Sequence, residues 1–218
     1  KKIKVNHEEY IKLAIELAEE AKGLTGANPP VGAVIVKDNK IISMGKTGID
    51  GIPHAETEAI SNAGDDVVGA TLYVSLEPCC HYGKTGPCTD AIIKSGIKEV
   101  IVAIADLDER MKGKSLAILR SNNIKVSSGY MEKEALEVCK GFFTRIVKNR
   151  PYIKIKIASS LDGKIALDNG ESKWITNTKS RAKVHYLRAK SDAVITGIGT
   201  VLKDAPELSC RIKGLEHY

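Results

Sequence analysis

The hydrophobic pattern of the first two thirds of the chain alternates between the periods of helices and strands. Apolar residues within 7–24 recur at three- and four-residue intervals, which is the spacing of one helix face. Short apolar runs bounded by Gly, Pro, Asn or Asp follow, as is typical of strands. After the first helix the pattern predicts strands over residues 31–36 and 41–45, a helix over 55–63, a strand over 70–76, a helix over 87–95, a strand over 100–105, a helix over 114–122, a strand over 124–127 and a helix over 131–150.

This alternation predicts a layered α/β domain. Residues 101–105 are apolar throughout, as expected of a central strand that is covered on both faces. In such domains functional side chains gather at helix starts beside strand ends. We therefore expect functional residues at those positions.

A break at residues 149–151 separates this domain from a second segment, because Pro151 ends the helix and an extended stretch follows at once. We place the domains at residues 1–149 and 150–218. Alternating Ile and Lys over 152–158 predict a strand, and a helix over 178–189 and a strand over 193–196 follow. Gly197 and Gly199 are a weak sign of a dinucleotide-binding loop and are equally typical of a turn.

Four residues of the first domain have the chemistry of a hydrolytic zinc site. His54, Cys79 and Cys88 offer three ligands of the types that zinc prefers, and a catalytic site leaves the fourth position to water. The predicted helix starts beside them favour thiolates. Glu56, two residues after His54, can move protons to and from that water without binding the metal. The pattern resembles that of the zinc deaminase superfamily, in which water attacks a ring carbon bearing an exocyclic amine.

A structural zinc site and buried free thiols are the alternatives for these cysteines. A structural site would need four protein ligands, and Cys80 or His81 could be the fourth. That interpretation leaves Glu56 without a role.

Composition narrows the choice of partner and compartment. Hydrophobic content of 43% and charged content of 28% are ordinary for a globular protein, and no apolar run approaches the roughly 20 residues of a membrane span. The formal charge of +6 is spread along the chain and aromatic residues make up only 5%, so an anionic small molecule is a better partner than nucleic acid. Charge that serves only solubility is the alternative. Five cysteines, three of them outside the zinc set, fit a cytoplasmic protein better than a disulfide framework.

Two polar stretches beside the zinc set are candidates for substrate binding. Eight residues separate Cys79 from Cys88, and their imidazole, ammonium and hydroxyl groups suit a phosphate or a polar ring edge. The amide of Asn28, just before the first strand, offers a donor and an acceptor to a pyrimidine edge. An Asn-Pro turn is the alternative role for Asn28.

Two longer runs make the resemblance to a family specific. Residues 77–88, Glu-Pro-Cys-x-His-Tyr-Gly-Lys-Thr-x-Pro-Cys, and residues 28–36 resemble the deaminase domain of the bifunctional riboflavin biosynthesis deaminase/reductase family. The resemblance implies a cytidine-deaminase-like three-layer α/β/α domain that deaminates 2,5-diamino-6-ribosylamino-4(3H)-pyrimidinone 5′-phosphate. It also implies His54, Cys79 and Cys88 as zinc ligands, Glu56 as the catalytic residue, and substrate contacts from Asn28, His81, Lys84 and Thr85.

Residues after 150 are similar to the start of the same family's reductase domain, notably at 159–166, 170–176 and 197–208. This similarity implies a dihydrofolate-reductase-like α/β fold that uses NADPH. The matching positions would place Ala158, Trp174, Thr200 and Asp204 at the cofactor, and Ser172, Arg188, Leu208 and Arg211 at the ribosyl phosphate. For Arg188 and Arg211, exposed helix and loop charge is the alternative.

A family reductase continues with further strands and a second glycine-rich loop, which residues 150–218 lack. We therefore hypothesise a truncated chain with a complete deaminase and a reductase segment that cannot reduce the substrate. Apolar surface on that segment would favour a homo-oligomer. The leading hypothesis for function is the riboflavin-pathway deaminase. A nucleoside, free-base or transfer-RNA deaminase and a non-catalytic zinc-stabilised binding module are the alternatives.

Overall fold

The computed structural model describes residues 6–83, 85–109 and 111–215. It divides into two compact units, Lys1–Tyr152 and Ile153–Tyr218, which are described separately below.

The first unit contains every helix and strand that the sequence predicts for it, with ends displaced by no more than three residues. The first helix ends at Ala21 and not at Leu24, because Lys22 is extended and Gly23 takes a positive φ of 95°. The elements in chain order are α1 (His7–Ala21), β1 (Gly32–Lys37), β2 (Lys40–Lys46), η1 (Ile49–Gly51), α2 (Ala55–Ala63), η2 (Gly64–Val67), β3 (Thr71–Leu76), α3 (Cys88–Ser95), β4 (Glu99–Ile104), α4 (Lys114–Ser121), β5 (Lys125–Ser128) and α5 (Glu132–Lys148).

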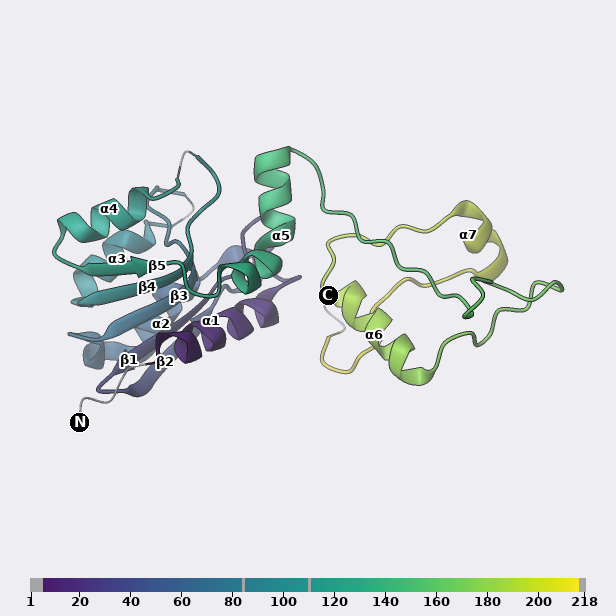
Figure 1. Cartoon of the computed structure of the whole chain (residues 1–218), viewed down its shortest axis with the longest axis horizontal. Coiled ribbons are helices and arrows are strands. Elements are labelled where there is room, and N and C mark those ends of the chain that lie inside the picture. The colour runs from purple at the N-terminus through teal and green to yellow at the C-terminus, as the bar shows by residue number, and fades with distance from the viewer. Residues whose placement is uncertain (1–5, 84, 110, 216–218) are drawn as a thin grey trace. The chain divides into compact units, whose positions relative to one another are not determined.

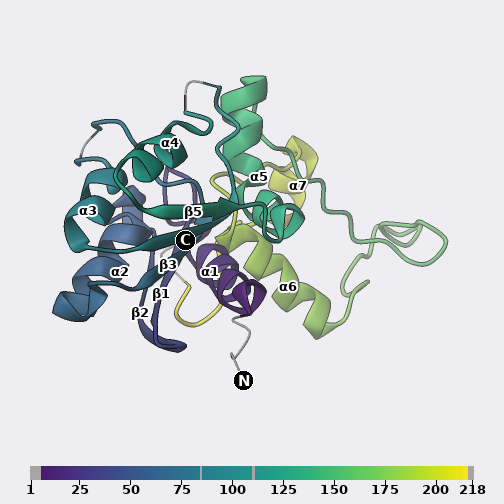
Figure 2. The same ribbon diagram turned by 60° about the vertical axis from the view of Figure 1, so that its left-hand side comes forward.

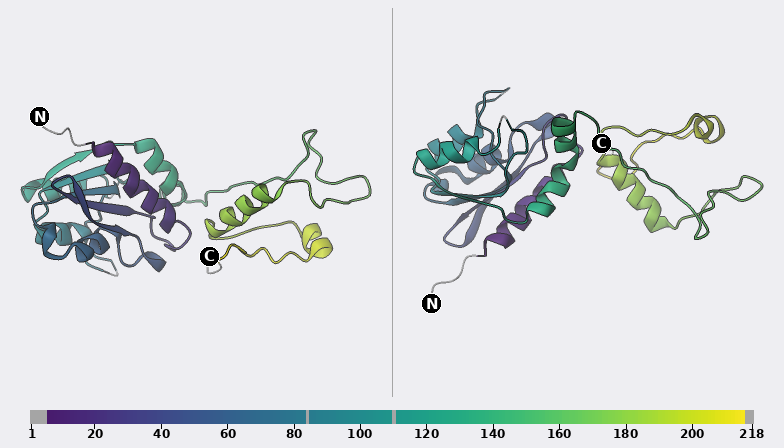
Figure 3. Two further views of the ribbon diagram at one scale, coloured as in Figure 1. Left: turned by 90° about the horizontal axis from the view of Figure 1, so that it is seen from below. Right: turned by 45° about the horizontal axis from the view of Figure 1, so that its top comes forward.

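These elements form the expected three layers around a five-stranded sheet of order β2-β1-β3-β4-β5 (Figure 1). β1 pairs antiparallel with β2 and β3, whereas β3, β4 and β5 are parallel. Helices α1 and α5 contact each other on one face, and α2, α3 and α4 cover the other (Figure 2). The α1–α5 pair, purple and green-teal, is also visible from below in Figure 3. The cytidine-deaminase-like architecture is thus confirmed.

The core lies in the middle strands, which are apolar on both faces. Val34 of β1, Val74 of β3 and Val102 of β4 are all fully buried, as expected where helices cover both sides of a sheet. Gly45 brings α2 close to β2, because a Cβ there would lie only 2.4 Å from the carbonyl oxygen of Ala55. The start of α2, where His54 and Glu56 lie, is therefore fixed against the sheet.

The second unit confirms one predicted element and corrects two. Helix α6 (Thr178–Ala189) has the predicted bounds. The strand predictions over 152–158 and 193–196 are wrong, because the described residues of this unit form no strand with which either stretch could pair. The side chains of Ile153, Ile155 and Ile157 are accordingly 68%, 84% and 71% exposed. Gly197 is the N-cap of the short helix α7 (Ile198–Asp204), and Gly199 lies in its first turn, so the Gly-x-Gly pair begins a helix.

None of the helices within the described ranges has the length and apolar character that a membrane crossing requires.

Candidate metal centre

Three elements bring the predicted zinc ligands together at one end of the sheet. His54 is the N-cap of α2, Cys88 is the first residue of α3, and Cys79 follows closely after the end of β3. β3 is the central strand of the sheet, and helices begin beside its carboxyl end. Residues that are 34 positions apart in the chain, His54 and Cys88, therefore become neighbours.

The spacing of the three ligand atoms fits a zinc ion. His54 Nδ1 lies 3.2 Å from Cys88 Sγ and 3.5 Å from Cys79 Sγ, and all three atoms lie within 4.8 Å of one another. In tetrahedral zinc with bonds of about 2.0 Å to nitrogen and about 2.3 Å to sulfur, ligand atoms are about 3.5 Å apart. Nδ1 faces both sulfurs and is therefore the imidazole nitrogen that could bind the ion.

The fourth protein ligand of a structural zinc site is not found among the described residues. The group of His, Cys and carboxylate atoms that could share a metal there consists of His54, Cys79 and Cys88, without Cys80 or His81. Three ligands are the number that a catalytic zinc site has.

Glu56 is buried in the first turn of α2, with only 3% of its surface exposed. Burial raises the pKa of its carboxyl to about 7, and the charge of Cys79 acts in the same direction. The carboxyl also interacts electrostatically with His54. A carboxyl with a pKa near neutrality can both accept and donate a proton, which is the property that general acid–base catalysis requires.

The two cysteines differ in their ionisation. A hydrogen bond from the Cys88 side chain lowers the pKa of Cys79 to about 4, and His54 and the Cys88 backbone N–H, 3.3 Å from Cys79 Sγ, contribute further. The same hydrogen bond, together with burial, raises the pKa of Cys88. The hydrogen bond to Cys79 also raises the pKa of His54. The thiolate form is thus favoured at Cys79, whose sulfur faces the backbone N–H of Cys88 at the start of α3.

Glu77 is an important residue of this region that the sequence reasoning missed. Its buried carboxylate accepts hydrogen bonds from the backbone N–H of Asp106 and Gly113, both at 3.0 Å, and from the hydroxyl and N–H of Ser115 at 2.8 and 3.2 Å. It thereby joins the end of β3, two residues before Cys79, to the start of α4. The signal in the sequence was an acidic residue directly after a buried strand, where an unpaired carboxylate would be costly.

Asn28 lies at the same end of the sheet as Cys79, because β1 runs antiparallel to β3. The backbone N–H of Gly32, at the start of β1, donates to Ser75 Oγ near the end of β3 at 3.0 Å. Asn28 forms a turn, with its N–H bonded to the Thr25 carbonyl, and its Nδ2 donates to the carbonyl oxygen of Asp50 at 3.2 Å. The turn role and the binding role are therefore compatible.

The loop between the zinc cysteines is exposed at His81, Tyr82 and Thr85. The Gly83 N–H donates to the Thr85 carbonyl at 3.1 Å, and the Tyr82 hydroxyl donates to Asp90 at 3.1 Å. Lys84 lies outside the described residues. Substrate contacts from His81, Lys84 and Thr85 stay predictions.

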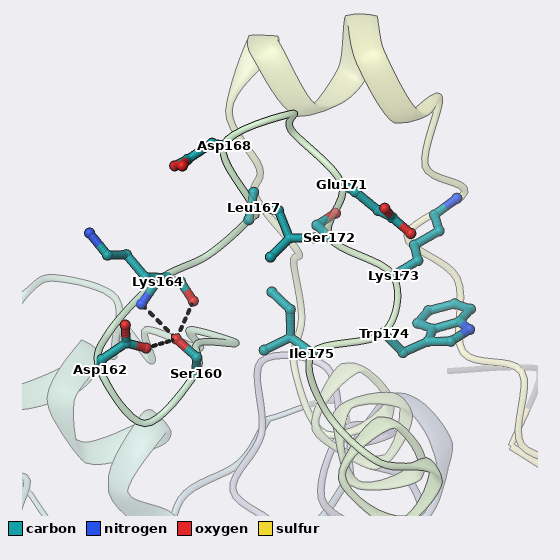
Figure 4. A pocket seen from close by; sticks show the side chains of 11 residues that line it. Ser160, Asp162, Lys164, Leu167, Asp168, Glu171, Ser172, Lys173, Trp174 and Ile175 are labelled. Atoms are coloured by element: carbon teal, nitrogen blue, oxygen red, sulfur yellow. Dashed lines mark hydrogen bonds between the residues drawn. The ribbon is translucent and has the colours of Figure 1, made fainter.

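In the second unit, Ser172 and Trp174 line a pocket of about 480 Å³ formed by residues 160–175 (Figure 4). Ser160 shapes its loop by bonds to Asp162 and Lys164. The Arg181 guanidinium lies 4.3 Å from the centre of the Trp174 ring. The other predicted reductase residues lie outside the lining of this pocket: Ala158, Arg188, Thr200, Asp204, Leu208 and Arg211.

The two arginines predicted to bind phosphate have local partners. Arg188 donates to the Ser209 carbonyl at 2.9 Å, and Arg211 pairs with Glu207 at 3.1 Å. Both side chains are thus tied to residues 207–209, and their role toward a phosphate stays a prediction.

Two protein-family models match separate stretches of the chain. Residues 4–104 match the family model of the cytidine and deoxycytidylate deaminase zinc-binding region, and this range includes His54, Glu56, Cys79 and Cys88. Residues 151–217 match the RibD C-terminal domain.

Individual relatives match nearly the whole chain. The riboflavin biosynthesis protein RibD of Aquifex aeolicus is 52% identical over 202 residues, and that of Escherichia coli is 43% identical over 209 residues. These matches cover 93% and 96% of this chain and 57% of each relative. The crystal structure of a diaminohydroxyphosphoribosylaminopyrimidine deaminase/5-amino-6-(5-phosphoribosylamino)uracil reductase from Thermotoga maritima superposes with a TM-score of 0.90 at 49% identity, covering 95% of this chain and 60% of that one. The chain therefore spans a little more than half the length of these relatives, and it belongs to the family of riboflavin biosynthesis proteins RibD.

Proposed function

We propose that this chain catalyses the zinc-dependent hydrolytic deamination of 2,5-diamino-6-ribosylamino-4(3H)-pyrimidinone 5′-phosphate in riboflavin biosynthesis. The observation that carries the proposal is the buried Glu56 beside the three-residue group of His54, Cys79 and Cys88. A structural metal site has no use for such a carboxyl, whereas hydrolysis needs a proton carrier. Membership of the RibD family supports this choice of substrate.

Each residue of the site has a defined task in the proposed reaction. His54 Nδ1 and the sulfurs of Cys79 and Cys88 would hold zinc, which when bound supplies Lewis-acid activation of a water molecule. Glu56 would take one proton from the water and pass it to a ring nitrogen. It would then take the second proton from the hydroxyl formed on the ring carbon and pass it to the departing amine. The amine leaves as ammonia and the water oxygen becomes the new ring carbonyl, so that all atoms balance.

The substrate would be held from two sides of the metal centre. We propose that Asn28 hydrogen-bonds the substrate from the start of β1. His81, Lys84 and Thr85 would bind a ring edge or the phosphate from the loop between the cysteines, where a cation and a hydroxyl suit an anion. This arrangement supports a phosphorylated small molecule as the partner and gives no role to nucleic acid or membrane.

For residues 151–217 we propose contacts to the two ligands of the family's second step, NADPH and the ribosyl substrate, and not the reduction itself. Trp174 with Ala158, Thr200 and Asp204 would contact NADPH, and Ser172 with Arg188, Leu208 and Arg211 would contact the substrate. Titration of the chain with NADPH, followed by Trp174 fluorescence, tests this part. An unchanged signal at millimolar NADPH would contradict it.

The reducing conditions of the cytoplasm suit this site, because Cys79 and Cys88 must stay reduced to hold zinc. We therefore propose a cytoplasmic location, which cell fractionation tests. A homo-oligomer stays a prediction, and light scattering of the purified chain would reveal a monomer if it is wrong.

Ammonia release from the phosphorylated diaminopyrimidinone by the zinc-loaded chain is the test of the proposed reaction. Cytidine, adenosine and a transfer RNA serve as competing substrates in parallel assays. We expect turnover of the pyrimidinone phosphate alone. Ammonia release from only one of the other substrates would indicate another class of deaminase. No ammonia release from any substrate, with one zinc bound per chain, would favour a binding module.

A further inference from the structure

The turn η1 (Ile49–Gly51) contacts the segment that carries Asn28 and leads into the segment that carries His54. η1 is closed by backbone bonds from Gly51 to the Gly48 carbonyl at 3.0 Å and from Gly48 to the Pro53 carbonyl at 2.8 Å, and it ends three residues before His54. The Asp50 N–H reaches back to the Leu24 carbonyl at 2.9 Å. The turn is thus fixed to both segments.

The contact between this turn and Asn28 decides which atom of the Asn28 amide is free. The carbonyl oxygen of Asp50 can only accept a hydrogen bond, so the group facing it at 3.2 Å must be Nδ2. In the part of the chain that the structure describes, Asn28 Oδ1 receives no hydrogen bond. Asn28 is half-buried and therefore still open to a ligand. The acceptor of the amide, Oδ1, is therefore available to a ligand.

Gly51 is the residue that makes this contact possible. It is buried, its φ is +87°, and a Cβ at this position would lie 1.9 Å from Asn28 Nδ2, 2.4 Å from Cγ and 2.8 Å from Cβ. Real Cβ atoms do not approach other atoms so closely, so any side chain at position 51 would displace the amide from Asp50.

We propose that Gly51 is a positioning residue, which seats the Asn28 amide against the Asp50 carbonyl so that Oδ1 accepts a hydrogen bond from an N–H or O–H of the substrate. The inference rests on the proposed function for the existence of a substrate at Asn28. The contact between Gly51 and Asn28 does not rest on it, and the two parts can be tested separately.

The test is a double-mutant cycle of Gly51→Ala with Asn28→Gly in the zinc-loaded chain. Asn28→Gly removes all three atoms that the new Cβ would strike. Gly69→Ala is the matched control, because Gly69 has a similar φ of +79° in the same unit but only the flexible Lys98 side chain nearby, at 3.7 Å. Asn28→Ala provides a second background, in which the amide alone is removed.

The melting temperature tests the contact without any need for turnover. We expect Gly51→Ala to lower it by at least about 3 °C more than Gly69→Ala does, and this excess should disappear in the Asn28→Gly background. The contact between Gly51 and Asn28 would be contradicted if the two glycine variants lowered the melting temperature equally. It would also be contradicted if the larger loss for Gly51→Ala persisted in both the Asn28→Gly and the Asn28→Ala backgrounds.

The steady-state kinetics test the positioning role. With zinc content unchanged, Gly51→Ala should lower kcat/KM about tenfold, mostly through KM, while Gly69→Ala changes it less than about twofold. In the Asn28→Gly background Gly51→Ala should have no further effect. Independent, multiplying losses would show that Gly51 does not act through Asn28. Absence of turnover in the unaltered chain would instead contradict the proposed function and leave the melting cycle as the test of the contact.

Discussion

Residues 31–36 and residues 152–158 are two apolar stretches with opposite outcomes. The first becomes β1, which pairs with β2 and β3 and is buried. The second stays extended, with Ile155 84% exposed, and finds no partner strand among the described residues of its unit. An apolar stretch thus becomes a strand only where neighbouring strands and a covering layer exist.

The candidate sites of the two units also differ in how firmly packed elements hold their residues. The metal centre combines residues from the ends of β3, α2 and α3, and these elements are held by the buried core. The pocket around Trp174 is lined by one continuous loop region, residues 160–175. A site on packed elements holds its geometry better than one on loops. We therefore place the chemistry in the first unit.

The largest expected effect is on core packing. Ile101→Ala, at a fully buried position of β4, should lower the free energy of unfolding of the first unit by about 4 kcal/mol, because it leaves a cavity. Ile155→Ala should cost less than about 0.5 kcal/mol. Urea unfolding followed by circular dichroism measures the first, and fluorescence of Trp174, the single tryptophan, measures the second. A comparable loss for Ile155→Ala would show that residues 152–158 are packed in solution.

Thiol labelling offers a second comparison of the two units. Cys139 and Cys210 are 1% and 7% exposed, but only Cys139 belongs to the large core, where burial raises its pKa to about 12. We expect alkylation of Cys139 to be about 100-fold slower than that of Cys210, because its exposure requires opening of the packed unit. Peptide mass spectrometry of the zinc-loaded chain gives both rates. Equal rates would mean that the two units open with similar ease.

The smallest expected effect is on stability, at Glu77, which supports the region of the metal centre. Glu77→Gln should lower the stability of the first unit by about 2 kcal/mol, since an amide cannot accept all the hydrogen bonds that the carboxylate receives from Asp106, Gly113 and Ser115. The exposed Glu9→Gln is the control and should stay within about 0.5 kcal/mol. Urea unfolding compares the two, and a loss no larger than that of the control would remove Glu77 from the scaffold of the site.

Much of the first unit was predictable because local and long-range signals agree there. The apolar run 101–105 and the helix start at Ala55 are local features, and the ligand types of His54, Cys79 and Cys88 indicated zinc before any distance was known. Contacts that depend on register and turn geometry were not predictable. The carboxylate of Glu77 and the approach of Gly51 to Asn28 arise from residues 22 or more positions apart, and no periodic pattern encodes them.

Parallel measurement of zinc content and ammonia release for Glu56→Gln tests the central claim most directly, with Glu9→Gln as the control. We expect Glu56→Gln to keep one zinc per chain and to lose at least about 100-fold in turnover, because the proton carrier is gone while all three ligands remain. Glu9→Gln should match the unaltered chain in both measurements. Loss of zinc from Glu56→Gln would show that Glu56 is a ligand, and full turnover would show that it carries no proton; either result would contradict the proposed mechanism.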